Sequence, residues 1–237
     1  MELKNKTVVV TGVSKGIGRA LVDLYLNEGC LVIGLGRNSA QTNHPQFHFI
    51  KTDVRSEDEV SKAFEQIRTE ISKEIHILIN NAGLGYFGKI ENLEMAQMRQ
   101  MFETNVYSVF YTAKEVVPMM KTQEYGHIFN IASTAGLESY PEVAAYCGSK
   151  FAVRAISGSM YKELRDFRIK VTCVYPGSVK TDFFRNNKYI EPHDYMLLPE
   201  DVAQMIVHAS QTPDNFHQVN LEVRPLQPKG PRKSKEG

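Results

Sequence analysis

The sequence has almost no net charge and no long apolar run, and these two absences exclude several kinds of protein. Its 237 residues carry 28 lysines and arginines against 27 aspartates and glutamates. A chain so balanced offers no strong electrostatic field for holding a nucleic acid or an anionic membrane. It contains no uncharged apolar run long enough for a transmembrane helix, and it begins without the apolar core of a signal peptide. We therefore expect neither a nucleic acid nor a membrane as partner.

Cysteine is scarce, and no metal-binding spacing is present. The three cysteines, Cys30, Cys147 and Cys173, are far apart and odd in number. This pattern is typical of a reducing compartment rather than of a disulfide framework or a zinc site. The seven histidines show no ligand spacing either. We expect a cytoplasmic protein that uses no metal.

What the sequence does contain is a regular alternation of strand and helix patterns. Strands are predicted at residues 7–11, 30–35, 47–52, 76–79, 127–132, 170–175 and 219–223. Helices are predicted at residues 17–28, 93–120, 142–166 and 199–210, and a capping box of Ser56 and Glu59 begins another. Such alternation predicts an α/β fold with a parallel sheet covered by helices on both faces. We expect one domain over residues 1–225, followed by a flexible basic tail at 226–237.

Small and polar residues follow the predicted strands, where ligands of an open parallel sheet bind. Gly12, Gly16 and Gly18 lie between the first strand and the first helix. They allow a tight turn and the close approach of a pyrophosphate to the start of that helix. A plain tight turn would not need three glycines. The next strand ends carry polar or small residues as well: Arg37, Asp53, Asn81, Ser133 and Gly177.

The end of the second strand bears on which dinucleotide would bind. A carboxylate usually stands about 20 residues beyond the glycines, where it accepts hydrogen bonds from a ribose. Gly36 and Arg37 occupy that region here. Arg37 can pair with a 2′-phosphate, and Lys15 in the glycine turn can reach the same group. Either cation alone is equally well explained as a solvated surface residue. Together they favour NADP(H) over NAD(H).

Two helices add further candidates. Asn105 lies within an apolar stripe of the helix at 93–120, and a buried amide needs hydrogen-bond partners, so it has a structural and a functional interpretation. On the later helix Tyr146 and Lys150 are four residues apart and share one face. An ammonium beside a phenol favours the phenolate, so we expect a lowered tyrosine pKa. The stripe itself is interpreted as core or subunit contact: Met95, Met98, Phe102, Val109, Ala113, Val116 and Met120.

Taken together, these motifs resemble the short-chain dehydrogenase/reductase family. The matching segments are TGVSKGIG at 11–18, Asp53-Val54, NNAG at 80–83, Asn105, Ser133, YCGSK at 146–150 and PGSVKT at 176–181. The resemblance covers about residues 6–224. It implies a single doubly wound Rossmann-type domain with a seven-stranded, mainly parallel sheet of order 3-2-1-4-5-6-7.

The resemblance also implies roles for individual residues. Tyr146 would be the general acid or base, and Lys150 would hold the nicotinamide ribose. Ser133 would hold the substrate oxygen, and Asn105 would keep a water that links Lys150 to solvent. The cofactor residues implied are Gly12, Ser14, Lys15, Gly16, Ile17, Gly18, Arg37, Asp53, Val54, Asn81, Ala82, Gly83, Tyr146, Lys150, Pro176, Gly177, Val179 and Thr181.

The function implied is hydride transfer between NADP(H) and a carbonyl or secondary alcohol. A non-catalytic NADP-binding sensor or scaffold on the same fold is the alternative, although such a protein would not need the whole set Asn105, Ser133, Tyr146 and Lys150. Apolar or aromatic residues after the fourth, fifth and sixth strands are candidates for substrate contact: Leu84, Tyr86, Leu137, Tyr140, Phe183, Phe184 and Tyr189.

The C-terminal sequence departs from the pattern of acyl-carrier-protein reductases. It resembles sepiapterin-reductase-like or 3-hydroxy-acid-dehydrogenase-like members instead. A pterin would require a carboxylate, for which Glu138, Asp182 and Glu222 remain open. We also expect a homodimer or homotetramer formed through the two long helices, since two-fold pairing is the commonest assembly.

Overall fold

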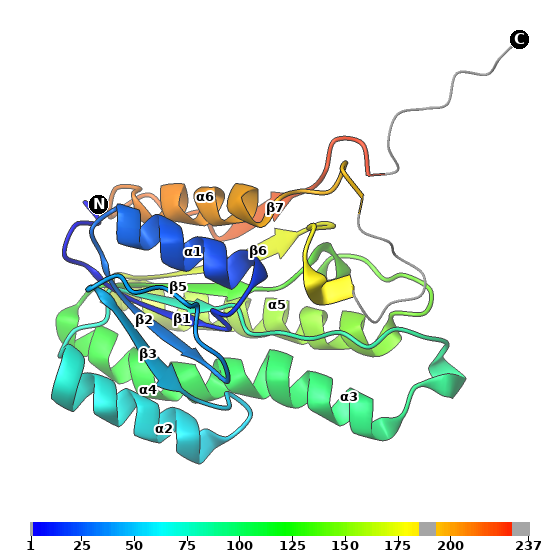
Figure 1. Ribbon diagram of the computed structural model, residues 1–237, viewed down its shortest axis with the longest axis horizontal. Helices are drawn as coiled ribbons and strands as arrows, with labels where there is room; N and C mark the ends of the chain where they lie inside the picture. Colours follow the sequence, from blue (N-terminus) through cyan, green and yellow to red (C-terminus); the bar gives the residue numbers. More distant parts are fainter. Residues whose placement is uncertain (1, 185–192, 229–237) are drawn as a thin grey trace, which may run out of the picture.

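Seven parallel strands form the centre of the protein. The structure is a computed structural model that describes residues 2–184 and 193–228 (Figure 1). The sheet has the order β3-β2-β1-β4-β5-β6-β7, and every neighbouring pair is parallel. The predicted fold class and strand order are therefore confirmed. The strands are β1 (Thr7–Thr11), β2 (Leu31–Gly36), β3 (Phe47–Lys51), β4 (Ile77–Asn80), β5 (Gly126–Ile131), β6 (Ile169–Pro176) and β7 (Asn220–Val223).

Helices cover both faces of this sheet (Figure 1). On one face lie α1 (Gly16–Asn27) and α6 (Pro199–Ser210); on the other lie α2 (Glu57–Gln66), α4 (Ser108–Gln123) and α5 (Ala144–Leu164). Strand β1 explains why both faces are needed, because successive side chains of a strand point to opposite sides. Val8 and Val10 pack into the core under α1 and α6, whereas Val9 packs into the core above α2 and α4.

The predicted helix at 93–120 is present as one helical run over residues 95–123. It consists of α3 (Met95–Phe102), a π-helical turn η3 (Glu103–Tyr107) and α4. The predicted long helix is therefore confirmed, but the π-turn was not foreseen, because apolar spacing does not distinguish a π-turn from an α-turn. Turns of this kind inside a helix often mark functional sites. This one contains Asn105.

Shorter helical segments connect the main elements. The segment η1 (Ile67–Ile71) extends α2, and η5 (Arg165–Phe167) extends α5. Three more segments precede or follow the strands near the site: η2 (Ile90–Asn92), η4 (Thr134–Gly136) and η6 (Asp182–Phe184). No helix in the described ranges is long and apolar enough to cross a membrane.

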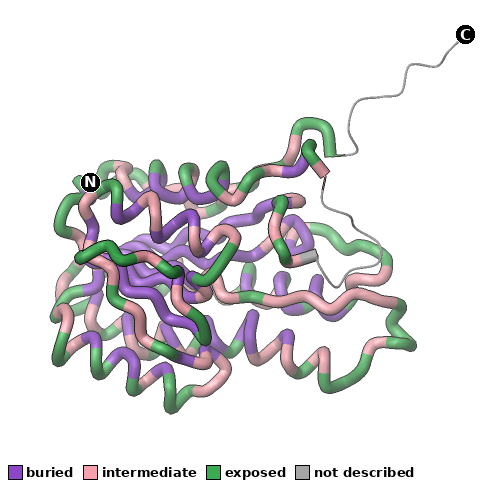
Figure 2. Tube along the Cα trace, in the orientation of Figure 1, coloured by how far each residue is buried: buried purple, intermediate pink, exposed green. Residues whose placement is uncertain are grey.

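The burial pattern shows which part of the apolar stripe predicted for residues 95–120 belongs to the core. Figure 2 shows buried strands between helices whose outer faces are exposed. Val109, Val116 and Met120 are buried in the core, which agrees with the interpretation of the stripe as core rather than as subunit contact. Met95 is 60% exposed and contributes little to that core. The stripe is therefore core along α4 and surface at the start of α3.

Candidate active site

A cavity of about 900 Å³ opens at the carboxyl ends of strands β1 to β6. Its lining includes every catalytic and cofactor residue predicted from the sequence except Gly18 and Asn105. Those two residues lie behind the cavity wall and support it, as described below. The sheet thus brings together residues that are far apart in the chain.

The glycine turn between β1 and α1 is held in a shape that side chains would prevent. Gly12 has φ of +73°, and a Cβ added there would lie 2.9 Å from the Cα of Ala82. A Cβ on Gly18 would lie only 2.1 Å from the carbonyl oxygen of Gly12. Gly18 therefore allows α1 to pack tightly against the turn. It does not line the cavity, although it was predicted among the residues that bind the cofactor.

Asn81 fixes this turn to the neighbouring strand end. Its side-chain nitrogen donates hydrogen bonds to the carbonyl oxygens of Thr11, at 2.9 Å, and Gly12, at 3.0 Å. In return the Thr11 hydroxyl accepts hydrogen bonds from the backbone N–H groups of Asn81 and Ala82, both at 3.0 Å. The ends of β1 and β4 are thereby joined. Backbone groups are paired with side chains, which fixes the shape of the turn before a ligand arrives.

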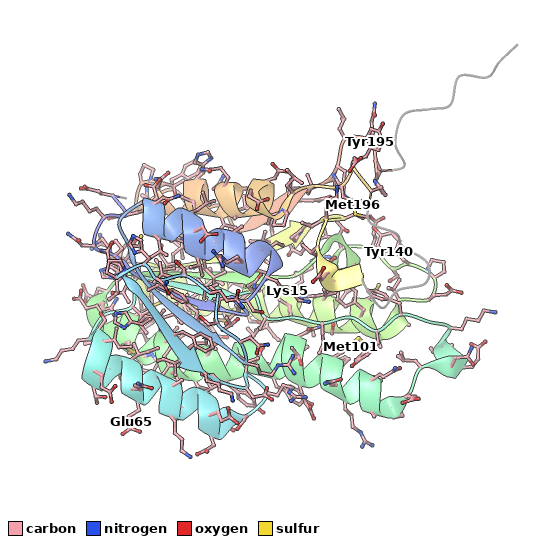
Figure 3. The ribbon with its side chains drawn as sticks, in the orientation of Figure 1. Lys15, Glu65, Met101, Tyr140, Tyr195 and Met196 are labelled. Atoms are coloured by element: carbon pink, nitrogen blue, oxygen red, sulfur yellow. The ribbon has the colours of Figure 1, made fainter. Side chains whose placement is uncertain are left out.

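Both charged residues predicted for a 2′-phosphate, Lys15 and Arg37, line the cavity. Arg37 is exposed at the end of β2 and lines the cavity. Lys15 directly precedes α1 (Figure 3). Its Nζ lies 3.5 Å from a carboxylate oxygen of Asp182, in an exposed ion pair beyond β6. Strands β2 and β6 stand on opposite sides of β1 in the sheet. Arg37 is therefore the cation that remains at the end of β2.

Sequence reasoning missed Arg55, which also lines this end of the cavity. It forms an ion pair with Asp53, at 2.5 Å between the closest nitrogen and oxygen. This pairing holds the pKa of the Asp53 carboxyl below its usual value, chiefly through the hydrogen bonds from Arg55. An arginine two residues after an aspartate at a strand end was the available signal.

Asn105 lies behind the cavity wall rather than on it, in the π-turn, and is 2% exposed. Its Oδ1 accepts the backbone N–H of Leu84, and its Nδ2 donates to the Leu84 carbonyl, both at 2.9 Å. Its Nδ2 also donates to Ser149 Oγ, at 3.0 Å. These hydrogen bonds satisfy the buried amide of Asn105, as its structural interpretation requires. They hold the segment after β4 in place, with Gly83 between Asn105 and Lys150.

Ser133, Tyr146 and Lys150 come together at the end of β5. Helix α5 carries Tyr146 and Lys150 one turn apart, and both are buried. The Lys150 Nζ donates a 2.8 Å hydrogen bond to the Ile131 carbonyl and lies 5.8 Å from the centroid of the Tyr146 ring. The Ser133 side chain lies near enough to Tyr146 to act on its pKa. The structure thus places a phenol, a hydroxyl and an amine at one point of the cavity.

Burial changes how these groups hold protons. It raises the pKa of Tyr146 to about 12, although the nearby Ser133 side chain partly offsets this rise. It lowers the pKa of Lys150 to about 8. The expected lowering of the tyrosine pKa is therefore not found. The Lys150 ammonium donates to a carbonyl, and desolvation of the phenolate dominates. At neutral pH the phenol keeps its proton, as a general acid must.

Aromatic rings surround Tyr146 on the side away from the glycine turn. The centroids of Phe87 and Phe183 each lie 5.5 Å from that of Tyr146, and 6.0 Å from each other. Phe183 was a predicted substrate-contacting residue, whereas Phe87 was missed. Leu84 and Tyr140 also line the cavity, as expected of substrate-contacting residues.

Two of the other predicted substrate contacts, Tyr86 and Leu137, do not line this cavity. Tyr86 donates a 2.5 Å hydrogen bond to Gln100 and lines a second cavity of about 270 Å³ instead. Leu137 packs against a small core cluster. Tyr189 and the side chain of Phe184 lie outside the described residues.

A polar cluster closes the far end of the cavity. Arg224 Nη1 donates to Glu138 at 2.7 Å, and Arg224 Nε donates to Glu222 at 2.5 Å. The Tyr140 hydroxyl donates to the same Glu138 oxygen at 2.5 Å. All three carboxylates considered for a pterin are thus in ion pairs, since Asp182 contacts Lys15.

The segment after β7 belongs to the wall of this cavity. Arg224, Pro225 and Pro228 line it, although the tail was predicted to be flexible from residue 226. Pro225 packs close to Gly177, because a Cβ on Gly177 would lie 3.0 Å from Pro225 Cδ. The rest of the predicted tail, residues 229–237, lies outside the described residues.

Comparison with known proteins agrees with this fold and arrangement. A family model described as short chain dehydrogenase matches residues 6–190. The chain therefore belongs to the short-chain dehydrogenase/reductase family and is an oxidoreductase of that family.

Individual relatives are similar over nearly the whole chain. An uncharacterized oxidoreductase of Staphylococcus saprophyticus is 33% identical, covering 94% of this chain and 97% of the relative. The closed form of a serine dehydrogenase complexed with NADP+ superposes with a TM-score of 0.83 and 25% identity, covering 98% and 97% of the two chains. A 3-ketoacyl-(acyl-carrier-protein) reductase from Brucella melitensis, complexed with NADH, has a TM-score of 0.87 at 22% identity, covering 95% and 99%, and shows the fold alone.

Proposed function

We propose that this protein transfers hydride between NADP(H) and a carbonyl or secondary alcohol. One observation carries the proposal. A protonated phenol, Tyr146, lies beside Ser133 and Lys150 in a cavity that continues to the glycine turn. Reduction of a carbonyl requires a hydride donor held in fixed geometry and a proton for the developing alkoxide. The cavity has room for the hydride donor, and Tyr146 can supply the proton.

The residues present fit a nicotinamide dinucleotide. The turn after β1 has no side chain at Gly12 and Gly16, so backbone can approach a pyrophosphate at the start of α1. When bound, the nicotinamide supplies or accepts the hydride. Residues at the other strand ends, Val54, Ala82, Pro176, Val179 and Thr181 among them, line the same cavity and would hold the rest of the cofactor.

The proton is handled by the chain itself. In the reducing direction Tyr146 gives its phenolic proton to the alkoxide oxygen, and the Ser133 hydroxyl holds that oxygen in reach. Lys150 places positive charge beside the phenolate that is left. In the oxidising direction the same phenolate takes the proton back. These roles use the positions at which the three side chains already lie.

Arg37 supports NADP(H) as the preferred cofactor. It stands at the end of β2 after Gly36, where a carboxylate would repel a 2′-phosphate. A guanidinium matches a phosphate through two parallel hydrogen bonds. The similar serine dehydrogenase was solved with NADP+, which supports the same preference. Because Lys15 contacts Asp182, we assign the larger part to Arg37.

We also propose that the protein self-associates through its long helices. Large apolar side chains are exposed there: Tyr107 by 47%, Phe110 by 50% and Phe151 by 37%. Two-fold pairing would bury such a surface. Light scattering at micromolar concentration should give a dimer or tetramer, and Phe110→Asp should weaken it. A wild-type monomer would contradict this assignment.

The experiment that tests the proposed function is a screen for NADPH consumption. Purified protein is supplied with diketones, aldehydes, 3-oxo esters and pterins, and the reverse reaction is tested with NADP+ and 3-hydroxy acids. We expect turnover of at least one carbonyl class. NADPH binding without turnover of any carbonyl or alcohol would favour the non-catalytic sensor or scaffold instead.

A further inference from the structure

Arg55 holds the carboxylate of Asp53 through a set of short hydrogen bonds. Its backbone N–H donates to Oδ1 at 3.1 Å. Its Nε donates to Oδ1 at 2.9 Å and to Oδ2 at 3.1 Å, and its Nη2 donates to Oδ2 at 2.5 Å. Both carboxylate oxygens are therefore bound to one arginine. Charge-assisted pairs of this forked kind are among the stronger hydrogen bonds in proteins.

Arg37 and Asp53 follow neighbouring strand ends, because the Gly36 carbonyl accepts the Thr52 backbone N–H at 2.9 Å. In keeping with this placement, the charge of Arg37 helps to lower the pKa of the Asp53 carboxyl, after the larger effect of Arg55. Yet the described part of the chain gives Arg37 no ion pair, and its side chain lines the cavity. Glu59 brings further negative charge, because its carboxylate accepts the backbone N–H of Asp53 at 2.7 Å. Arg37, Asp53 and Arg55 thus line the same end of the cavity, and the Glu59 carboxylate is bound to the backbone of Asp53.

We infer that Arg55 determines specificity for a 2′-phosphorylated dinucleotide by occupying Asp53 and so leaving Arg37 available to the phosphate. This inference rests on the proposed function. Without Arg55, Asp53 would pair with Arg37 from the neighbouring strand end, and Arg37 would turn away from the ligand. The uncompensated carboxylates of Asp53 and Glu59 would in addition repel the phosphate. Arg55 therefore acts through another residue and need not touch the phosphate.

Dissociation constants of NADPH and NADH, measured by nucleotide fluorescence, test this inference without requiring turnover. Four proteins are compared: wild type, Arg55→Ala, Asp53→Asn and the double variant. We expect Arg55→Ala to weaken NADPH binding about tenfold while changing NADH binding by less than about threefold, as the loss of one exposed charge-assisted contact implies. The double variant should recover most of the NADPH affinity, because an amide at 53 no longer captures Arg37.

Matched controls separate this role from a general effect of losing an arginine. Arg68→Ala removes an arginine that pairs with Glu115 away from the cavity, and it should leave both constants unchanged. In Arg37→Ala the further change Arg55→Ala should have little additional effect, since the two residues act on one phosphate contact. Melting temperatures of all variants confirm that they are folded.

The outcomes are distinct. Failure of the double variant to recover NADPH binding would overturn the inference, since Arg55 would then touch the phosphate itself. Equal weakening of NADH and NADPH would also overturn it, because Arg55 would only shape the turn after β3. A wild type that binds neither nucleotide would overturn the proposed function and this inference with it. That outcome is recognisable before any variant is made.

Discussion

The two ends of the cavity are built in different ways. The end near the glycine turn is made of residues directly at strand ends, and side chains such as Asn81 join those ends through backbone hydrogen bonds. The end beyond Tyr146 is made of side chains from separate loops, including Phe87, Phe183 and Arg224. The first end is fixed by the sheet itself. The second depends on which side chains the loops bring, so substrate choice can change without disturbing the cofactor end.

Tyr146→Phe should have the largest effect and should separate chemistry from binding. The variant loses the only proposed proton donor while keeping the ring that packs against Phe87 and Phe183. We expect kcat to fall by about 10²–10⁴-fold. The dissociation constant of NADPH should be almost unchanged. A variant that kept more than about a tenth of the wild-type kcat would exclude Tyr146 as the general acid.

The pH dependence of reduction should follow Lys150 rather than Tyr146. Because its pKa is lowered to about 8, Lys150 is charged below that pH and loses its charge above it. The Tyr146 pKa of about 12 keeps the phenol protonated throughout. We expect kcat/KM for carbonyl reduction to be flat at low pH and to fall above pH 8 by up to about tenfold per unit.

Two variants test whether Lys150 is responsible for the fall of kcat/KM above pH 8. Lys150→Arg, which keeps its charge, should flatten the profile between pH 6 and 10. Lys150→Ala should lose both rate and cofactor affinity at every pH. If the falling limb kept its midpoint in Lys150→Arg, another group would be responsible for it.

Arg37→Asp should alter cofactor choice at the glycine-turn end alone. A charge-assisted hydrogen bond is worth about 1.5–3 kcal/mol, so even one at full value separates the cofactors more than about tenfold. Solvent exposure reduces this figure. We expect kcat/KM to favour NADPH in the wild type and the preference to shrink or invert in the variant. Equal or better use of NADH by the wild type would show that Arg37 is an ordinary surface cation.

Phe183→Ala should have the smallest effect and should act only at the substrate end. The ring lies 5.5 Å from Tyr146 and lines the cavity, so its loss removes apolar contact with a substrate. We expect KM for an apolar carbonyl to rise by about three- to tenfold, in line with partial loss of one buried aromatic surface. The dissociation constant of NADPH is the control. A matching change in that constant would mean that the two ends are not independent.

The glycine-turn end could be predicted closely because its signals are local. Gly12, Gly16 and Gly18 fall within one short segment, and the alternation of strands and helices places Asp53 and Asn81 beside them. Strand order and both helical layers were confirmed for the same reason. Arg55 was missed because an arginine two residues after an aspartate is common, and only the folded turn brings its side chain onto Asp53.

Burial and long-range packing set the limit of sequence reasoning at the other end. The Tyr146 pKa moved opposite to the expected direction, since spacing reveals a neighbouring lysine but not the loss of water around the phenol. Arg224 meets Glu138 across a large part of the chain, so no local pattern indicates that contact. The same holds for Phe87, which no motif distinguishes from the neighbouring Tyr86.

The π-turn at Glu103–Tyr107 absorbs one residue of chain length without changing which faces of the flanking helices are buried. Such a turn holds one residue more than an α-helical turn, as if a residue had been inserted without ending the helix. Met101 before the turn and Val116 and Met120 after it are all buried. Deleting one residue within the turn would close it into a regular helix with little rotation of α4, whereas deleting one residue within α4 would turn the residues after it by about 100°. We therefore expect the first deletion to displace Asn105 and the second to be the more destabilising for the core.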